Sequence, residues 1–239
     1  MIRRMAQILC FSIFFVGTLA GAQELTIIGH VKLTDSSINA KSSQAKNVVV
    51  WLKPVAAQPM QPLIPNKPLR LTQHNKTFEP HLLVVPVGAV VEFPNRDPFF
   101  HNVFSLFEGK KFDLGLYEAG TSREVSFDRP GVSYIFCNIH AEMSAVVIAL
   151  DTPYYAIADR EGEIAIPRVP VGRYTLQAWA ETALPENLAA VTREVALSED
   201  NSRLGLIEIN IGGISTAHKN KYGLDYEPPA PNSPGYQQP

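Results

Sequence analysis

Short apolar runs recur along most of the chain, and Pro, Gly and polar turn residues separate them. The runs are rich in β-branched residues and several of them alternate apolar with polar positions, so the pattern predicts an all-β protein. The best candidate for a short helix is Pro185–Ala190. The expected strands lie within residues 24–33, 47–55, 69–75, 81–87, 89–95, 121–127, 132–137, 144–150, 154–179, 191–197 and 204–211.

The proline content and the spacing of the apolar runs change along the chain, and these changes predict more than one domain. Residues 54–69 contain five prolines and indicate an extended connection. The short, regularly spaced strands that follow, up to about residue 150, are typical of a Greek-key sandwich. After Asp151 the alternation becomes tighter and predicts further strands. Residues 213–239 are rich in proline and polar residues and indicate an irregular tail.

The first 22 residues have the pattern of a secretory signal peptide. Arg3 and Arg4 precede an apolar run from Met5 to Leu19, and the small residues Ala20, Gly21 and Ala22 follow it. The run is short for a membrane span, so we expect cleavage and a periplasmic or secreted protein with no membrane span afterwards. An uncleaved N-terminal anchor is the alternative.

The charge of the mature chain argues against a nucleic-acid partner. Residues 1–22 hold two of the 21 Lys and Arg residues and no acid, so 19 basic residues remain against 23 acidic ones, a net charge of −4. The sequence has no nucleophile elbow, phosphate-binding loop or dinucleotide glycine motif. We therefore expect a protein that is not an enzyme.

The main candidate for chemistry is the stretch FCNIHAEM, which holds Cys137, His140 and Met143 between two expected strands. Cys137 is the only cysteine after the leader, so it is a buried structural thiol, an intermolecular partner or a metal ligand. His101 follows another strand end. Two imidazoles, a thiolate and a thioether form the ligand set of a trigonal copper site with a weak axial Met. Zinc is the alternative metal, although Met is a poor fourth ligand for it, and we expect the adjacent Glu142 to point away.

Two segments together resemble the cupredoxins, the small blue-copper proteins. They are AVVEFPNRDPFFHNVFS at 89–105 and FDRPGVSYIFCNIHAEMSAVVIAL at 127–150, with an amicyanin-type Cys-x-x-His-x-x-Met loop. The resemblance implies a cupredoxin domain at 65–150 with one type 1 copper.

The resemblance also assigns roles to single residues. It implies the metal ligands His101, Cys137, His140 and Met143, and it makes Asn102 a residue that ties the two ligand loops together. Phe99, Phe100 and Phe136 would exclude water from the site, and His140 would be the solvent-side imidazole through which electrons leave. These positions are all taken from the matching motifs.

Residues 154–179 resemble the carboxypeptidase regulatory-like (transthyretin-like) sandwich. The turn Asp159–Gly162 is followed by an alternating strand and by VPVGRYTL at 169–176. The early strands resemble the opening of the same module, so residues 24–55 and 152–212 are expected to form one smaller, discontinuous β-sandwich. The alternative places the early strands in the cupredoxin domain. Such modules are non-catalytic scaffolds or binding surfaces, so this resemblance implies no activity.

The whole pattern predicts an exported protein that carries single electrons to or from a redox partner protein in the periplasm. The likeness to amicyanin implies a methylamine-utilization context. The alternatives are a copper-binding or delivery protein and an envelope interaction or carbohydrate-binding module with structural metal. His74 and His81 would support delivery if they bind metal, but a surface role is the simpler interpretation of both, and His30 and His218 look incidental.

Overall fold

The computed structural model describes most of the chain and is nearly all β. The described residues are 23–35, 45, 47–57, 60, 65, 68–106, 109–212 and 218–226. Within these ranges there is one α-helix, α1 (Pro185–Val191), where the sequence predicts it. The expectation of an all-β fold is therefore confirmed. The expected signal peptide, residues 1–22, and most of the Pro-rich tail lie outside the described residues.

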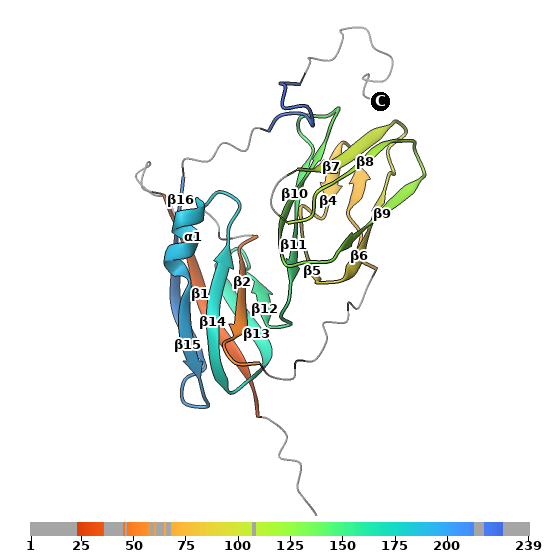
Figure 1. Cartoon of the computed structure of the whole chain (residues 1–239). Coiled ribbons are helices and arrows are strands. Elements are labelled where there is room, and N and C mark those ends of the chain that lie inside the picture. Colours follow the sequence, from red (N-terminus) through yellow and green to blue (C-terminus); the bar gives the residue numbers. More distant parts are fainter. Residues whose placement is uncertain are drawn as a thin grey trace, which may run out of the picture.

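The first sandwich is built from both ends of the chain (Figure 1). Its two sheets have the strand orders β13-β1-β16 and β12-β2-β14-β15, and a buried apolar cluster fills the space between them. The strands are β1 (Glu24–Asp35), β2 (Val49–Pro54), β12 (Tyr155–Ile157), β13 (Glu163–Pro170), β14 (Gly172–Trp179), β15 (Arg193–Leu197) and β16 (Arg203–Ile211).

Strand alternation explains how β1 takes its central place in the first sandwich. Ile27, Val31 and Leu33 face the core, while polar or half-buried residues alternate with them. β1 pairs antiparallel with β13 and parallel with β16, and β2 pairs antiparallel with β12 and β14. These are the pairings that a discontinuous sandwich requires. Its membership of the carboxypeptidase regulatory-like family stays a prediction.

The second sandwich contains the segment between those two halves. Its five-stranded sheet has the order β5-β11-β10-β7-β8, and the pairs β3-β4 and β6-β9 complete it around a second apolar cluster. The strands are β3 (Thr72–His74), β4 (Thr77–Glu79), β5 (Leu82–Pro86), β6 (Ala89–Pro94), β7 (His101–Ser105), β8 (Phe112–Tyr117), β9 (Ser122–Phe127), β10 (Gly131–Cys137) and β11 (Ser144–Leu150).

β11 is apolar without alternation because both of its faces are covered. Ala145, Val147 and Ala149 belong to the core of the second sandwich. Val146 and Ile148 instead join a third cluster, in which Leu82, Val84 and Leu150 meet Val49 and Trp179 of the first sandwich. A strand buried on both faces is expected to read as a continuous apolar run. The two sandwiches are therefore held together partly through β11.

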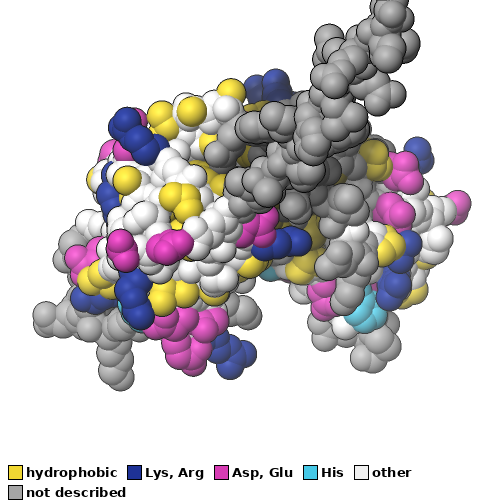
Figure 2. Space-filling view, turned by 90° about the horizontal axis from the view of Figure 1, so that it is seen from below, with side chains coloured by type: hydrophobic (Ala, Val, Ile, Leu, Met, Phe, Trp, Pro, Cys, Tyr) yellow, Lys and Arg dark blue, Asp and Glu magenta, His cyan; other side chains and the backbone are white. Residues whose placement is uncertain are grey.

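The outer surface has the mixed character expected for a protein of small net charge. On the face shown in Figure 2, Asp and Glu side chains are interspersed with Lys and Arg side chains and with apolar ones. Within the described residues, no helix is both long and apolar enough to cross a membrane.

Candidate metal centre

Neighbouring strands bring two of the predicted ligands together. Cys137 is the last residue of β10 and pairs with Val103 of β7. His101 begins β7 two positions earlier, so it lies on the same face of the sheet as Val103 and near the end of β10. His140 follows in the loop between β10 and β11. His101 therefore lies beside this loop, as predicted, but it begins a strand that the sequence did not predict instead of following a strand end.

Three donor atoms converge at this point. The Nδ1 atoms of His101 and His140 are 3.1 Å apart, and the Sγ atom of Cys137 lies 3.6 Å from the first and 3.5 Å from the second. The exposed fractions of His101, Cys137 and His140 are 0%, 0% and 5%. They form a group whose ligand atoms all lie within 4.8 Å of one another.

These separations fit a shared metal ion. Imidazole nitrogen and thiolate sulfur bind a small first-row ion at about 2.0 Å and about 2.3 Å. Donors about 110° apart then lie roughly 3.3 Å (N to N) and roughly 3.5 Å (N to S) from each other. The observed spacing agrees with both values to within a few tenths of an ångström.

Met143 closes the ligand loop. Its amide donates to the His140 carbonyl at 3.1 Å, and its own carbonyl accepts from the Cys137 amide at 3.2 Å. The side chain is fully buried and belongs to the same apolar cluster as Cys137. Its role as an axial ligand stays a prediction.

The environment of Cys137 opposes ionisation unless a cation is present. Burial raises the pKa of its thiol, and the backbone N–H groups of Asn102, Ile139 and His140 lower it by less. Burial disfavours an isolated thiolate, whereas a bound metal ion stabilises it. The pocket is therefore suited to a metal thiolate more than to a free anion.

Both histidines are neutral at neutral pH. Burial, and then repulsion from His101, lowers the pKa of His140 to about 4. Burial also lowers the pKa of His101, against the opposing effect of the Asp97 carboxylate. A neutral imidazole keeps a nitrogen lone pair, which is the form that binds metal.

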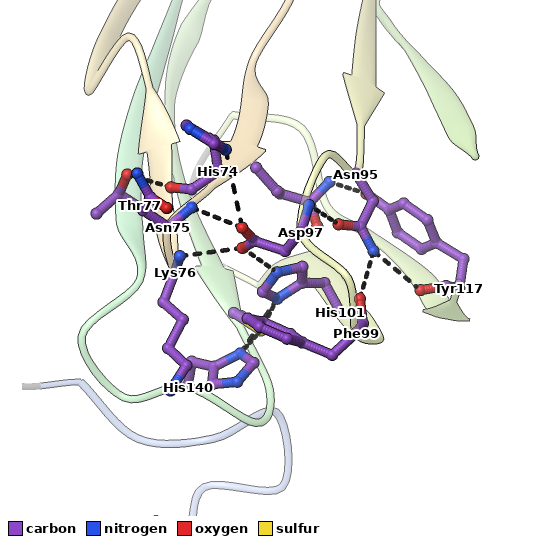
Figure 3. Close-up of polar contacts among 12 residues, drawn as sticks. His74, Asn75, Lys76, Thr77, Asn95, Asp97, Phe99, His101, Tyr117 and His140 are labelled. Atoms are coloured by element: carbon purple, nitrogen blue, oxygen red, sulfur yellow. Dashed lines mark hydrogen bonds and ion pairs between the residues drawn. The ribbon is translucent and has the colours of Figure 1, made fainter. Parts of the chain in front are cut away.

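Asp97 fixes the orientation of His101. The Nε2 atom of His101 donates to Oδ2 of Asp97 at 2.8 Å, and the carboxylate is buried (Figure 3). Since Nε2 carries the proton, the bare Nδ1 atom faces Cys137 and His140. A carboxylate behind a ligand histidine holds the ring and raises its basicity.

The same carboxylate holds the β3–β4 hairpin over the site. Asn75 and Lys76 form the turn with φ angles of 52° and 54°, as in two-residue hairpins. Their amides donate to Asp97 at 2.6 Å and 3.0 Å. Burial alone would raise the pKa of Asp97, but these amides and His101 lower it overall. Asp97 was not predicted as a site residue, because its only local signal is its position four residues before His101.

Asn102 joins the two ligand segments through its backbone. Its carbonyl accepts from the Asn138 amide at 3.0 Å, while its side-chain Nδ2 donates to Oδ1 of Asp113 at 2.7 Å. The contact between the segments that carry His101 and Cys137 thus uses a main-chain atom of Asn102.

The aromatic surroundings differ partly from expectation. The Phe99 ring lies 5.2 Å from the His101 ring and 5.5 Å from the His140 ring, and Phe136 is also buried. Phe100 is 51% exposed, so its expected place among the residues that exclude water is wrong.

His140 is the more exposed of the two imidazoles, as the resemblance implies for the solvent-side ligand, but it is almost fully buried. It is 5% exposed. Figure 3 shows the Lys76 side chain reaching from the hairpin turn toward His140, and its Nζ atom lies 5.7 Å from the centre of the Phe99 ring. The hairpin, which the ligand motifs do not include, therefore covers this side of the site.

The other histidines lie outside the donor cluster. His74 is half exposed, and its Nδ1 atom is 3.9 Å from Oδ1 of Asp97. His81 contacts Oε2 of Glu181 at 2.7 Å and the Ser144 carbonyl at 3.1 Å, and His30 contacts Oε1 of Glu163 at 2.9 Å. Glu142 is exposed, as expected.

A scan of protein-family models and a search of curated protein sequences find no match to this chain. Among solved structures, it is similar to a copper-containing nitrite reductase from Thermus scotoductus SA-01, with 23% identity and a TM-score of 0.34, over 38% of this chain and 25% of that chain. A purple cupredoxin from Nitrosopumilus maritimus gives 23% identity and a TM-score of 0.32, over 34% of this chain and 99% of that chain. An amicyanin variant in the Cu(I) form gives 18% identity and a TM-score of 0.33, over 37% of this chain and 87% of that chain. The matched region is thus a quarter of the nitrite reductase and most of the other two chains.

Proposed function

We propose that this chain is an exported type 1 copper protein that carries single electrons between redox partner proteins in the periplasm. The observation that carries the proposal is the convergence of the Nδ1 atoms of His101 and His140 with Sγ of Cys137 in a buried pocket. Two imidazoles and a thiolate suit copper, and Met143 stands at the sequence position of a weak axial ligand.

Each residue has a defined task in this proposal. His101, Cys137 and His140 hold the metal, and Asp97 keeps the lone pair of His101 directed at it. Copper bound by this donor set supplies a one-electron couple between its two common oxidation states. The donor atoms come from strand ends and a loop that closes on itself through Met143, so their spacing is set by the fold.

The burial of the site supports electron transfer more than catalysis. Catalytic metal sites keep an open position for water or substrate, whereas these donors are almost fully buried. Phe99 packs against both imidazoles and excludes water from them. A dry and rigid ligand set changes little when the metal gains or loses an electron. We therefore propose a carrier, not an enzyme.

The delivery alternative receives less support from the histidines that suggested it. His81 is engaged with Glu181 and Ser144, and His74 lies on the far side of Asp97 from His101 (Figure 3). Neither extends the donor cluster toward the surface. Export and a periplasmic partner rest on the leader-like pattern of residues 1–22, and the methylamine-utilization context rests on the sequence resemblance alone.

Addition of Cu(II) to the purified protein tests the proposal. We expect one equivalent to produce an intense thiolate-to-copper absorption near ~600 nm that Cys137→Ser abolishes and Met143→Leu keeps at a shifted position. Cys137→Ser preserves the size and burial of the side chain, so folding is checked by circular dichroism. A colourless protein that binds zinc in preference would show that the site is not type 1 copper.

A further inference from the structure

A segment that follows the first sandwich in sequence lies across the metal-ligand loop, which is the β10–β11 loop that carries His140 and Met143. Residues 218–226, which we name the C-terminal strap, follow β16 in sequence but lie beside the end of β10 (Figure 1). The Tyr226 hydroxyl donates to the backbone carbonyl of Cys137 at 2.7 Å. Cys137 is therefore bonded to the β10–β11 loop through its amide and to the strap through its carbonyl.

A second set of bonds joins the strap to the residues directly after two predicted ligands. The Lys221 amide donates to Oδ1 of Asn138 at 2.9 Å. Its ammonium donates to Oδ2 of Asp113 at 2.7 Å, and the other oxygen of that carboxylate accepts from Asn102 at 2.7 Å. Lys221 thus links the strap to the neighbours of both Cys137 and His101.

Ring packing and a local turn give the strap a defined shape. The His218 ring stacks on Phe136 with centres 4.0 Å apart, so the expectation that His218 is incidental is wrong. The Tyr226 ring stands perpendicular to His218, and its Oη atom is 3.1 Å from Nδ1 of that histidine. Within the strap, Oδ1 of Asn220 accepts from the amides of Tyr222 and Leu224.

We propose that the C-terminal strap holds the metal-ligand loop in place and that Tyr226 is a positioning residue for Cys137. This inference rests on the proposed copper function. With the Cys137 amide and carbonyl both bonded, the backbone that carries Sγ is fixed relative to His140 three residues later. Loss of the Tyr226 hydroxyl leaves the buried Cys137 carbonyl without its donor and frees the loop, so the distances between Sγ and the two Nδ1 atoms become more variable.

Tyr226→Phe tests the proposal because it removes the hydroxyl and keeps the ring. In the metal-free protein we expect Cys137 to react with a thiol reagent roughly three- to tenfold faster, the effect of one lost hydrogen bond. In the copper-loaded protein we expect a shifted thiolate band and a shifted reduction potential. Tyr155→Phe is the matched control, since it makes the same chemical change on β12 of the first sandwich, away from the strap.

Lys221→Met gives an independent second variant if Tyr226→Phe folds poorly. It breaks the link to Asp113 and keeps most of the side-chain length, so we expect changes in the same direction. The proposal is overturned if both variants match the wild type in thiol reactivity, absorption and potential. A wild type without a thiolate band would refute the copper function instead, and the thiol reactivity of the metal-free variants would still decide whether the strap holds the loop.

Discussion

At the scale of single residues, burial sets the chemistry of the three donor side chains. It raises the pKa of Cys137 and lowers the pKa values of His101 and His140. The metal-free site therefore holds a neutral thiol beside two neutral imidazoles at neutral pH. Binding of a cation must then be accompanied by release of the thiol proton, which makes metal affinity increase with pH.

Asp97→Asn tests how far the carboxylate supports the ligand His101. An amide keeps the shape of the side chain and its acceptor oxygen but removes the negative charge behind the imidazole. We expect copper affinity to fall about 10- to 100-fold, as for other partners of ligand histidines, and the reduction potential to rise. A competition titration with a chelator and a voltammogram measure the two quantities.

The control for this prediction is Asp128→Asn. Asp128 is largely exposed, and its partner Lys110 lies at the surface. The same chemical change there should leave affinity and potential at wild-type values. Equal effects of both substitutions would show that net charge matters and that the contact with His101 does not.

The low pKa of His140 predicts how the stability of the metal-free protein depends on pH. Its folded-state pKa of about 4 lies below the ordinary value of 6.5, so between these values the unfolded state binds more protons. The free energy of unfolding therefore falls as pH is lowered from about 6.5 to about 4, by on the order of 3 kcal/mol from this residue.

Urea denaturation of metal-free wild type and His140→Gln at several pH values measures that slope. The Gln variant lacks the titrating group and should lose less stability over the same range. A wild type whose free energy of unfolding is constant from pH 6.5 to 4.5 would contradict the burial of a neutral His140.

At the scale of secondary-structure elements, the two faces of β11 pack against different apolar clusters. Val146 faces the first sandwich and Val147 faces the core of the second, and both are fully buried. Each Val→Ala change removes two buried carbons and is expected to lower the free energy of unfolding by about 2 kcal/mol.

The two substitutions should differ in what they affect. Val147→Ala loosens the sandwich that carries the donors and should weaken copper binding. Val146→Ala loosens the contact between the sandwiches and should leave the copper absorption unchanged. Denaturation curves followed at the copper band and by circular dichroism distinguish these effects. A copper band equally sensitive to both would contradict the separation.

The elements also show what sequence alone can predict. The pattern Cys137-x-x-His140-x-x-Met143 is local and lies between two clear strands, so the loop could be predicted. The sequence does not predict β4, β7 or β8. In β8, Gly115 has a positive φ angle and the pairing with β7 shifts register, so the strand is distorted. The burial of His140 could not be predicted, since the hairpin turn that covers it is distant in sequence and motifs record only local spacing.

At the scale of the whole molecule, two sandwiches from an interleaved chain meet through an apolar cluster, with the donor cluster in the second of them (Figure 1). The chain returns from the first sandwich to the second through the C-terminal strap. The site is thus bordered by the β3–β4 hairpin and by a segment from the end of the chain. Neither contact is visible in the sequence pattern, because each depends on pairing between distant segments.

The most direct test of the central claim is a spectroelectrochemical titration of the copper-loaded protein. The proposed function predicts that the thiolate band disappears on reduction and returns on oxidation, with one electron per chain and one reversible midpoint potential. Loss of copper on reduction, or a band that does not return, would contradict an electron carrier and favour a protein that delivers the metal.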